Sequence, residues 1–188
     1  MSDSTSATTP PAAAPAGPTI QVPWARMLTI SLALFSLDQI TKWAIITNLQ
    51  HREIIPVIGD FFGLTLVYNT GMAWGLGQGN NALFIGLCVA TLGTLLYLTH
   101  RGNFICNWTR TGVALLMAGV SGNLADRIAH GYVIDFLDFT FSLGNWHYAY
   151  PTFNVADICI VSAAFLFIIG SFFTTRSEQE LATAKKPA

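Results

Sequence analysis

Apolar residues are concentrated in four long runs, and shorter polar segments separate them. The runs cover residues 24–47, 82–99, 111–128 and 153–173. A helix needs about 20 apolar residues to cross the hydrocarbon core of a bilayer, because each residue adds only about 1.5 Å along its axis. The pattern therefore predicts four transmembrane helices that form one domain over residues 24–175.

Two connecting segments are too polar or too broken to span. Residues 54–68 are rich in β-branched and aromatic side chains and contain a turn signal at Gly59-Asp60, which predicts short strands. Residues 129–152 are expected to form a loop at the aqueous interface. Aromatic residues suited to that position are Trp146, Tyr148 and Tyr150. The predicted fold class is an all-α membrane protein with a small extracytoplasmic β element and an interfacial loop.

The composition agrees with membrane insertion. The chain has 188 residues, of which 52% are hydrophobic and 10% charged, and its mean hydropathy is +0.50. Soluble domains carry about 25% charged residues. The net charge of −1 gives no reason to expect a nucleic-acid partner. Residues 1–23 are rich in Ser, Thr, Ala and Pro and are expected to form a disordered tail, while residues 176–188 are expected to form a polar cytoplasmic tail.

The basic residues predict the orientation. Those on one side of the predicted spans are Arg26, Arg101, Arg110, Arg176, Lys185 and Lys186. Those towards the other side are Lys42, Arg52 and Arg127. Lys and Arg are enriched in cytoplasmic segments, so both termini are expected in the cytoplasm. The polar ends of the third and fourth spans then meet at the outer face.

Two aspartates are the candidate catalytic residues. Asp135 follows the third span, and Asp157 lies near the start of the fourth. Ionisable groups at such positions are costly in lipid and usually mark a functional site. Two carboxylates in a dry site share one proton, because both cannot ionise easily. One member of such a pair can activate a water while the other protonates a leaving amine, which is the chemistry of peptide hydrolysis.

Other polar residues are candidates to orient these carboxylates or to bind substrate. Four occupy the facing ends of the third and fourth spans: Asn123, Asp126, Arg127 and Asn154. Asp38 and Lys42 are four residues apart on the first span, so they share a helix face and can form an ion pair. A purely structural interpretation also stays open, in which this polar cluster only joins the helices.

Three other chemistries are open to the same sequence. Gly119-Val120-Ser121-Gly122 matches the Gly-x-Ser-Gly of rhomboid-type serine proteases, with His130 or His147 as base, but no histidine lies in a predicted span. No His-Glu-x-x-His occurs, so no metal site is predicted. A proton-coupled transporter can use intramembrane aspartates, although four short spans without a repeat leave little room for alternating access.

Five short motifs resemble, in their order along the chain, those of bacterial lipoprotein signal peptidase (signal peptidase II), an aspartyl protease. They are Asp38-Gln39-x-x-Lys42, Asn69-x-Gly71-x-Ala73, Gly122-Asn123-x-x-Asp126-Arg127, Val133-Ile134-Asp135-Phe136 and Phe153-Asn154-x-Ala156-Asp157. The resemblance covers about residues 24–173 and implies that Asp135 and Asp157 are catalytic. It implies a supporting or substrate-binding role for Asn69 and Gly71. Met72 and Trp74 depart from the family pattern, which affects the expected shape of the substrate cleft.

The resemblance implies removal of a signal peptide just before a cysteine that carries a diacylglyceryl group. The expected partners are lipid-modified prolipoproteins and membrane lipids, and no cofactor is expected because water is the nucleophile. The expected location is the bacterial inner membrane, with the active site of a monomeric chain at the outer, periplasmic face. The alternatives from other classes are a small transporter and a membrane protein that binds lipoproteins without cutting them.

Overall fold

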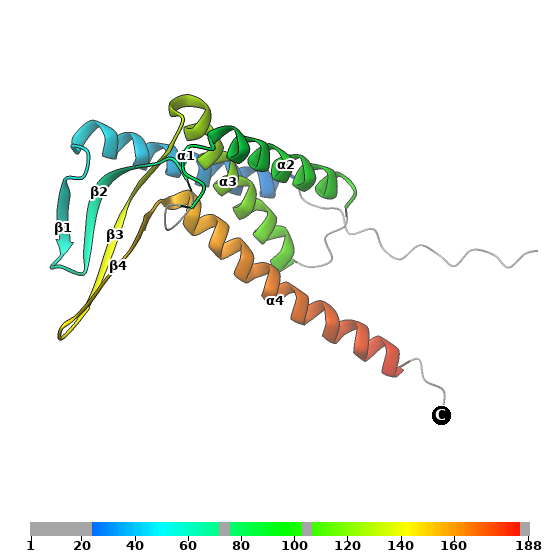
Figure 1. Ribbon diagram of the computed structural model, residues 1–188. Coiled ribbons are helices and arrows are strands. Elements are labelled where there is room, and N and C mark those ends of the chain that lie inside the picture. The colour runs from blue at the N-terminus through cyan, green and yellow to red at the C-terminus, as the bar shows by residue number, and fades with distance from the viewer. Residues whose placement is uncertain (1–23, 72–75, 103–106, 185–188) are drawn as a thin grey trace, which may run out of the picture.

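The computed structural model describes residues 24–71, 76–102 and 107–184, with side chains up to residue 172. In this part of the chain four helices extend from one side of a four-stranded sheet (Figure 1). The helices are α1 (Trp24–Asn48), α2 (Asn81–His100), α3 (Asn107–His130) and α4 (Val155–Ala184). Each begins and ends within a few residues of a predicted span, except that α4 continues through most of the expected C-terminal tail. The expected N-terminal tail lies outside the described residues, and so do Met72 and Trp74, the two residues that depart from the family pattern.

The expected all-α class is not confirmed, because the β element that was expected to be small is a four-stranded sheet. Its strands are β1 (Ile54–Ile58), β2 (Phe62–Asn69), β3 (Val133–Leu143) and β4 (Trp146–Phe153), antiparallel throughout and ordered β1-β2-β3-β4. The β1–β2 hairpin confirms the strands and the turn predicted over residues 54–68.

The loop predicted for residues 129–152 is instead mostly the β3–β4 hairpin. Aromatic side chains pair across it, Phe139 opposite Tyr150 and Phe141 opposite Tyr148. Such cross-strand aromatic pairs stabilise antiparallel strands. Gly144 forms the turn with a φ of 59°, in the left-handed region that glycine adopts without steric cost. The hairpin therefore rests on pairings between residues, and the interfacial aromatic residues noted in the sequence are part of a strand.

Helix α3 lies at the centre of the helical part and packs against the three other helices. Its small residues Ala114 and Ala118 are buried, and a side chain at Gly119 would collide with the carbonyl oxygen of Ala156 on α4. Small residues let helix backbones approach closely. Small residues of α3 thus form its contacts with both α1 and α4.

Within the described residues, two helices are long and apolar enough to cross a membrane: α2, and α4 over Val155–Phe172. Helices α1 and α3 carry more polar residues, and these are the residues that build the site. Composition thus supports membrane insertion for two of the four spans that the sequence predicts.

Candidate active site

Asp157 lies in the first turn of α4, where Asn154 caps the helix. The side-chain oxygen of Asn154 accepts the backbone N–H of Asp157 at 2.9 Å, and Asp157 Oδ2 accepts the backbone N–H of Asn154 at 3.1 Å. This reciprocal arrangement satisfies two of the N–H groups that a helix start leaves without partners. From α3, Asn123 Nδ2 donates to Asp157 Oδ1 at 2.9 Å. The Asn-x-x-Asp spacing therefore positions Asp157 locally, and Asn123 fixes its second oxygen.

Asp135 lies on β3, opposite Val67 of β2, and is only 2% exposed. Its Oδ1 accepts a hydrogen bond from Asn154 Nδ2 at 2.7 Å, and its Oδ2 accepts one from Asn69 Nδ2 at 2.9 Å. Burial raises the pKa of Asp135 to about 7; the charge of Asp157 acts in the same direction, and the bonds from Asn69 and Asn154 partly oppose it. Near neutral pH this carboxyl group can therefore both hold and release a proton.

Asn154 joins the two aspartates. It is fully buried and lies between β4 and α4, so its side chain reaches Asp135 while its backbone and side-chain oxygen engage Asp157. The two carboxylates, which we call the carboxylate pair, are 22 positions apart in the sequence (157 − 135) and meet at one amide. The convergence expected from the sequence is observed, and the catalytic role of the pair remains a prediction.

Arg127 supports the Asn69 side of the pair. Its Nη2 donates to the carbonyl oxygen of Gly71 at 2.6 Å, and its guanidinium lies 4.4 Å from the ring centre of Phe84. The N–H of Gly71 in turn donates to Asn69 Oδ1 at 2.9 Å, which leaves the Asn69 NH2 group directed at Asp135. Arg127 thus orients Asn69 through the backbone of Gly71, and the arrangement fits the expected supporting role.

A second group of charged residues lies next to the pair and contacts the backbone beside each of its members. Lys42 Nζ is 2.8 Å from both Asp38 Oδ2 and Asp126 Oδ2, and all three side chains are at most 2% exposed. We call these three residues the ion cluster. The predicted Asp38–Lys42 ion pair is present. Asp126 of α3 also contacts Lys42, which the spacing of residues on α1 alone does not predict.

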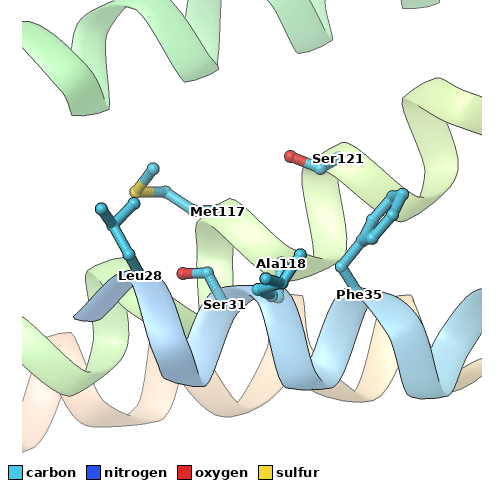
Figure 2. A pocket seen from close by; sticks show the side chains of 7 residues that line it. Leu28, Ser31, Phe35, Met117, Ala118 and Ser121 are labelled. Atoms are coloured by element: carbon cyan, nitrogen blue, oxygen red, sulfur yellow. The ribbon is translucent and has the colours of Figure 1, made fainter. Parts of the chain in front are cut away.

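The alternative nucleophile Ser121 lies elsewhere. It lines an apolar pocket of about 300 Å³ between α1 and α3, whose other lining residues are Leu28, Ser31, Leu32, Phe35, Met117 and Ala118 (Figure 2). His130 stacks on Tyr132, and His147 bonds with Ser142 on the β3–β4 hairpin. Ser121 thus has no histidine base beside it in the described residues, which disfavours the rhomboid-type reading.

Metal chemistry gains no support from the side-chain geometry. Over residues 24–71, 76–102 and 107–172, no group of three or more His, Cys, Asp or Glu side chains is placed to hold a metal ion.

Three residues in this region were not among the predicted site residues. Gln39 Nε2 contacts both Asp38 and Asp126 at 3.1 Å, Asn81 Nδ2 donates to the Arg127 carbonyl at 3.1 Å, and Phe84 contacts the Arg127 guanidinium. Gln39 had a signal in the sequence, as part of the Asp38-Gln39-x-x-Lys42 motif and as a polar residue inside an apolar run. Asn81 and Phe84 gave no signal in the sequence, because an amide at a helix start and a phenylalanine in a span are ordinary.

Comparisons with known proteins match most of the chain. A family profile described as "Signal peptidase (SPase) II" matches residues 30–173. The chain is 37% identical over 159 residues to "Lipoprotein signal peptidase" of Neisseria meningitidis serogroup B, covering 82% of this chain and 93% of the relative. It is 40% identical over 138 residues to the protein of the same name from Moorella thermoacetica, covering 71% of this chain and 84% of the relative.

Two solved structures share the fold. One, described as "Bacterial membrane enzyme structure by the in meso method at 2.3 A resolution", superposes with a TM-score of 0.69 at 27% identity, covering 88% of this chain and 94% of that one. Another bacterial membrane enzyme superposes with a TM-score of 0.64 at 29% identity, covering 78% and 92%. The matched segment contains both the carboxylate pair and the ion cluster. The chain belongs to the signal peptidase II family.

Proposed function

We propose that this protein removes signal peptides from lipoproteins by hydrolysing the peptide bond before a cysteine that carries a diacylglyceryl group. Family membership supports the reaction and the relatives' name supports the substrate class. The observation that carries the proposal of an aspartic endopeptidase is the meeting of Asp135 and Asp157 at Asn154. The side chains that donate hydrogen bonds directly to the two carboxylates are the amides of Asn69, Asn123 and Asn154.

The reaction uses one shared proton. The ionised member of the pair takes a proton from a water, and the water oxygen attacks the carbonyl carbon of the scissile bond. The protonated member then gives its proton to the leaving nitrogen as the carbon–nitrogen bond breaks, so the pair again holds one proton. Asp135 is suited to this exchange because its pKa of about 7 lies near the operating pH. No cofactor takes part in this sequence of steps.

The other predicted site residues have supporting roles in this proposal. Asn123 and Asn154 hold the carboxylates, while Asn69, Gly71 and Arg127 form one side of the site beside the extended substrate. The ion cluster lies too deep to touch substrate, since each of its members is at most 2% exposed.

All four helices cross the membrane in this proposal, with both termini in the cytoplasm of a monomeric inner-membrane protein. Four charged residues of α1 and α3 face protein and not lipid in this proposal, because Asp38, Lys42, Asp126 and Arg127 are all buried. A lipid-modified cysteine is held at the membrane surface, and the position of Asp135 on β3 and of Asp157 in the first turn of α4 supports an active site at that depth. Membrane lipids then surround the helices and also hold the diacylglyceryl group of the substrate.

The test is cleavage of a lipid-modified prolipoprotein by the purified protein in detergent, followed by mass spectrometry. Wild type is expected to release the signal peptide and to leave the unlipidated precursor intact. Asp135→Asn and Asp157→Asn are expected to bind the precursor without cutting it, whereas Ser121→Ala keeps full activity. Cleavage by either Asn variant at the wild-type rate would refute the aspartic mechanism, and binding without cleavage by wild type would favour a non-catalytic lipoprotein-binding protein.

A further inference from the structure

The ion cluster bonds to the backbone at two positions next to the carboxylate pair. Asp38 Oδ1 accepts the N–H of Ala156 at 2.8 Å, and Ala156 directly precedes Asp157. Asp126 Oδ2 accepts the N–H of Ile134 at 3.1 Å, and Ile134 directly precedes Asp135. Each carboxylate of the ion cluster therefore holds the segment that carries one member of the pair.

Lys42 sets the separation of these two anchor points. Its ammonium lies between Asp38 and Asp126 at 2.8 Å from each, and Gln39 Nε2 bridges the same two carboxylates at 3.1 Å. Ion pairs of this kind are stiff when buried, because losing one partner leaves an uncompensated charge in a low dielectric. The distance between the Ala156 and Ile134 backbones is thus tied to the contacts of one ammonium group.

Lys42 also decides how the Asn123 amide is oriented. Lys42 Nζ lies 3.1 Å from Asn123 Oδ1, and an ammonium group can only donate hydrogen bonds. The oxygen of this amide must therefore face Lys42, and its NH2 group then faces Asp157 Oδ1 at 2.9 Å. With this contact, all three N–H groups of the ammonium have an acceptor.

We propose that Lys42 is a positioning residue for peptide-bond hydrolysis, which sets the spacing and orientation of Asp135 and Asp157 through Asp38, Asp126 and Asn123. The proposal rests on the proposed function and adds to it the residue that aligns the pair. Lys42 is 1% exposed, so it acts through these neighbours and does not touch the substrate. Small displacements of catalytic groups are costly, and a shift of about 1 Å can lower a rate about 100-fold.

The charge of Lys42 provides a readout that a purely structural role would not move. Burial raises the pKa of Asp135, the charge of Asp157 on α4 adds to the rise, and the positive charge of Lys42 on α1 opposes it. Arg127 on α3 also interacts electrostatically with Asp135. Removing the ammonium should therefore move the ionisation of Asp135, and with it the alkaline limb of the pH–rate profile, to higher pH.

The experiment measures kcat, KM and the pH–rate profile for cleavage of a lipid-modified prolipoprotein. Lys42→Met removes the charge and all three hydrogen bonds, and we expect kcat to fall about 100-fold with KM within threefold and the alkaline limb shifted upward. The control is Gly112→Ala, whose added methyl group meets the ring of Phe167 at the α3–α4 contact away from the pair. It should lower the melting temperature and leave the pH profile unchanged.

A matched variant separates geometry from charge. Gln39→Leu removes the bridging amide and keeps the ammonium, so kcat should fall at least fivefold while the alkaline limb stays at the wild-type pH. If Lys42→Met does not fold, Lys42→Gln, which keeps two N–H donors and removes the charge, takes its place. A kcat within threefold of wild type with an unmoved alkaline limb in that variant would overturn the positioning role.

Two failures are distinguishable. Absence of cleavage by wild type refutes the proposed function. An active wild type, together with a Lys42→Met variant whose kcat lies within threefold of it and whose alkaline limb is unmoved, refutes only the positioning role.

Discussion

The polar end of the helical bundle holds two pairs of aspartates, which differ in what lies between their carboxylates. Between Asp38 and Asp126 lies an ammonium, which contacts an oxygen of each at 2.8 Å. Between Asp135 and Asp157 lies the amide of Asn154. The first pair has a permanent positive charge beside it, whereas the second has only neutral donors.

This difference separates a structural pair from a reactive one. A carboxylate with a cation and a backbone N–H in contact has its charge balanced by neighbours that also hold it in place. Two carboxylates that receive only amide hydrogen bonds repel one another, so they favour a state with one proton between them. A proton that can move at neutral pH is what general acid–base catalysis requires.

The largest expected effect comes from neutralising either member of the reactive pair. Asp135→Asn and Asp157→Asn should lower the cleavage rate about 1000-fold or more, since each removes the acid or the base, and both variants should remain folded. Single-turnover cleavage and thermal unfolding in detergent measure the two quantities.

The matched change in the structural pair should lower stability more than it lowers the cleavage rate. Asp126→Asn breaks a buried ion pair and should lower the free energy of unfolding by about 3–5 kcal/mol, while a measurable cleavage rate remains. Equal loss of rate in Asp126→Asn and Asp135→Asn, with equal stability, would remove the distinction between the pairs.

The pH–rate profile should reflect the reactive pair. Burial, and then the charge of Asp157, raise the pKa of Asp135 to about 7, so Asp135 is protonated below this pH and ionised above it. Above about pH 7 the pair loses the proton that the leaving amine needs, and the rate should fall about tenfold per pH unit. Cleavage rates between pH 5 and pH 9 provide the measurement. A rate that keeps rising to pH 9 would speak against a shared proton.

A smaller effect is expected where one amide is removed from the reactive pair. Asn69→Ala deletes the hydrogen bond to Asp135 Oδ2, which stabilises the ionised form, so the pKa of Asp135 should rise further. We expect an alkaline limb at higher pH and a rate about tenfold lower, from the usual strength of hydrogen bonds to charged groups. Asn48→Ala is the control, because Asn48 is exposed and bonds to its own helix.

The smallest expected effect concerns the aromatic contact behind the site. Phe84→Leu removes the ring that lies 4.4 Å from the Arg127 guanidinium, an interaction worth about 1 kcal/mol. The melting temperature should fall by about 2–4 °C with little change in kcat. Phe165→Leu, at a position 62% exposed, should leave the melting temperature unchanged. An identical shift in both variants would show that Arg127 does not depend on the ring.

The sequence was sufficient to predict that the two carboxylates meet, because local spacing and the order of the helices already bring them together. Asp157 follows Asn154 at capping spacing, and α3 must end where α4 begins, so residues near Asp135 and Asp157 share one end of the bundle. The i, i+4 spacing likewise predicted that Asp38 meets Lys42.

Other features depend on tertiary contacts that no local pattern encodes. The β3–β4 hairpin was predicted as a loop, because its aromatic and polar residues suit an interface as well as a strand, and only the pairing of Phe139 with Tyr150 decides between them. The role of Gln39 depends on α3 bringing Asp126 within 3.1 Å. Side chains of this kind acquire a role only through the packing of helices that are distant in sequence.

The central claim, that the carboxylate pair activates a water, is tested most directly by a single turnover in H₂¹⁸O with enzyme in excess over a lipid-modified prolipoprotein. Attack by water predicts one ¹⁸O in the new C-terminal carboxylate of the released signal peptide and none in the protein fragments that contain Asp135 or Asp157. Incorporation of ¹⁸O into either aspartate, with an unlabelled signal peptide, would show that a carboxylate attacks the substrate directly and would contradict the account.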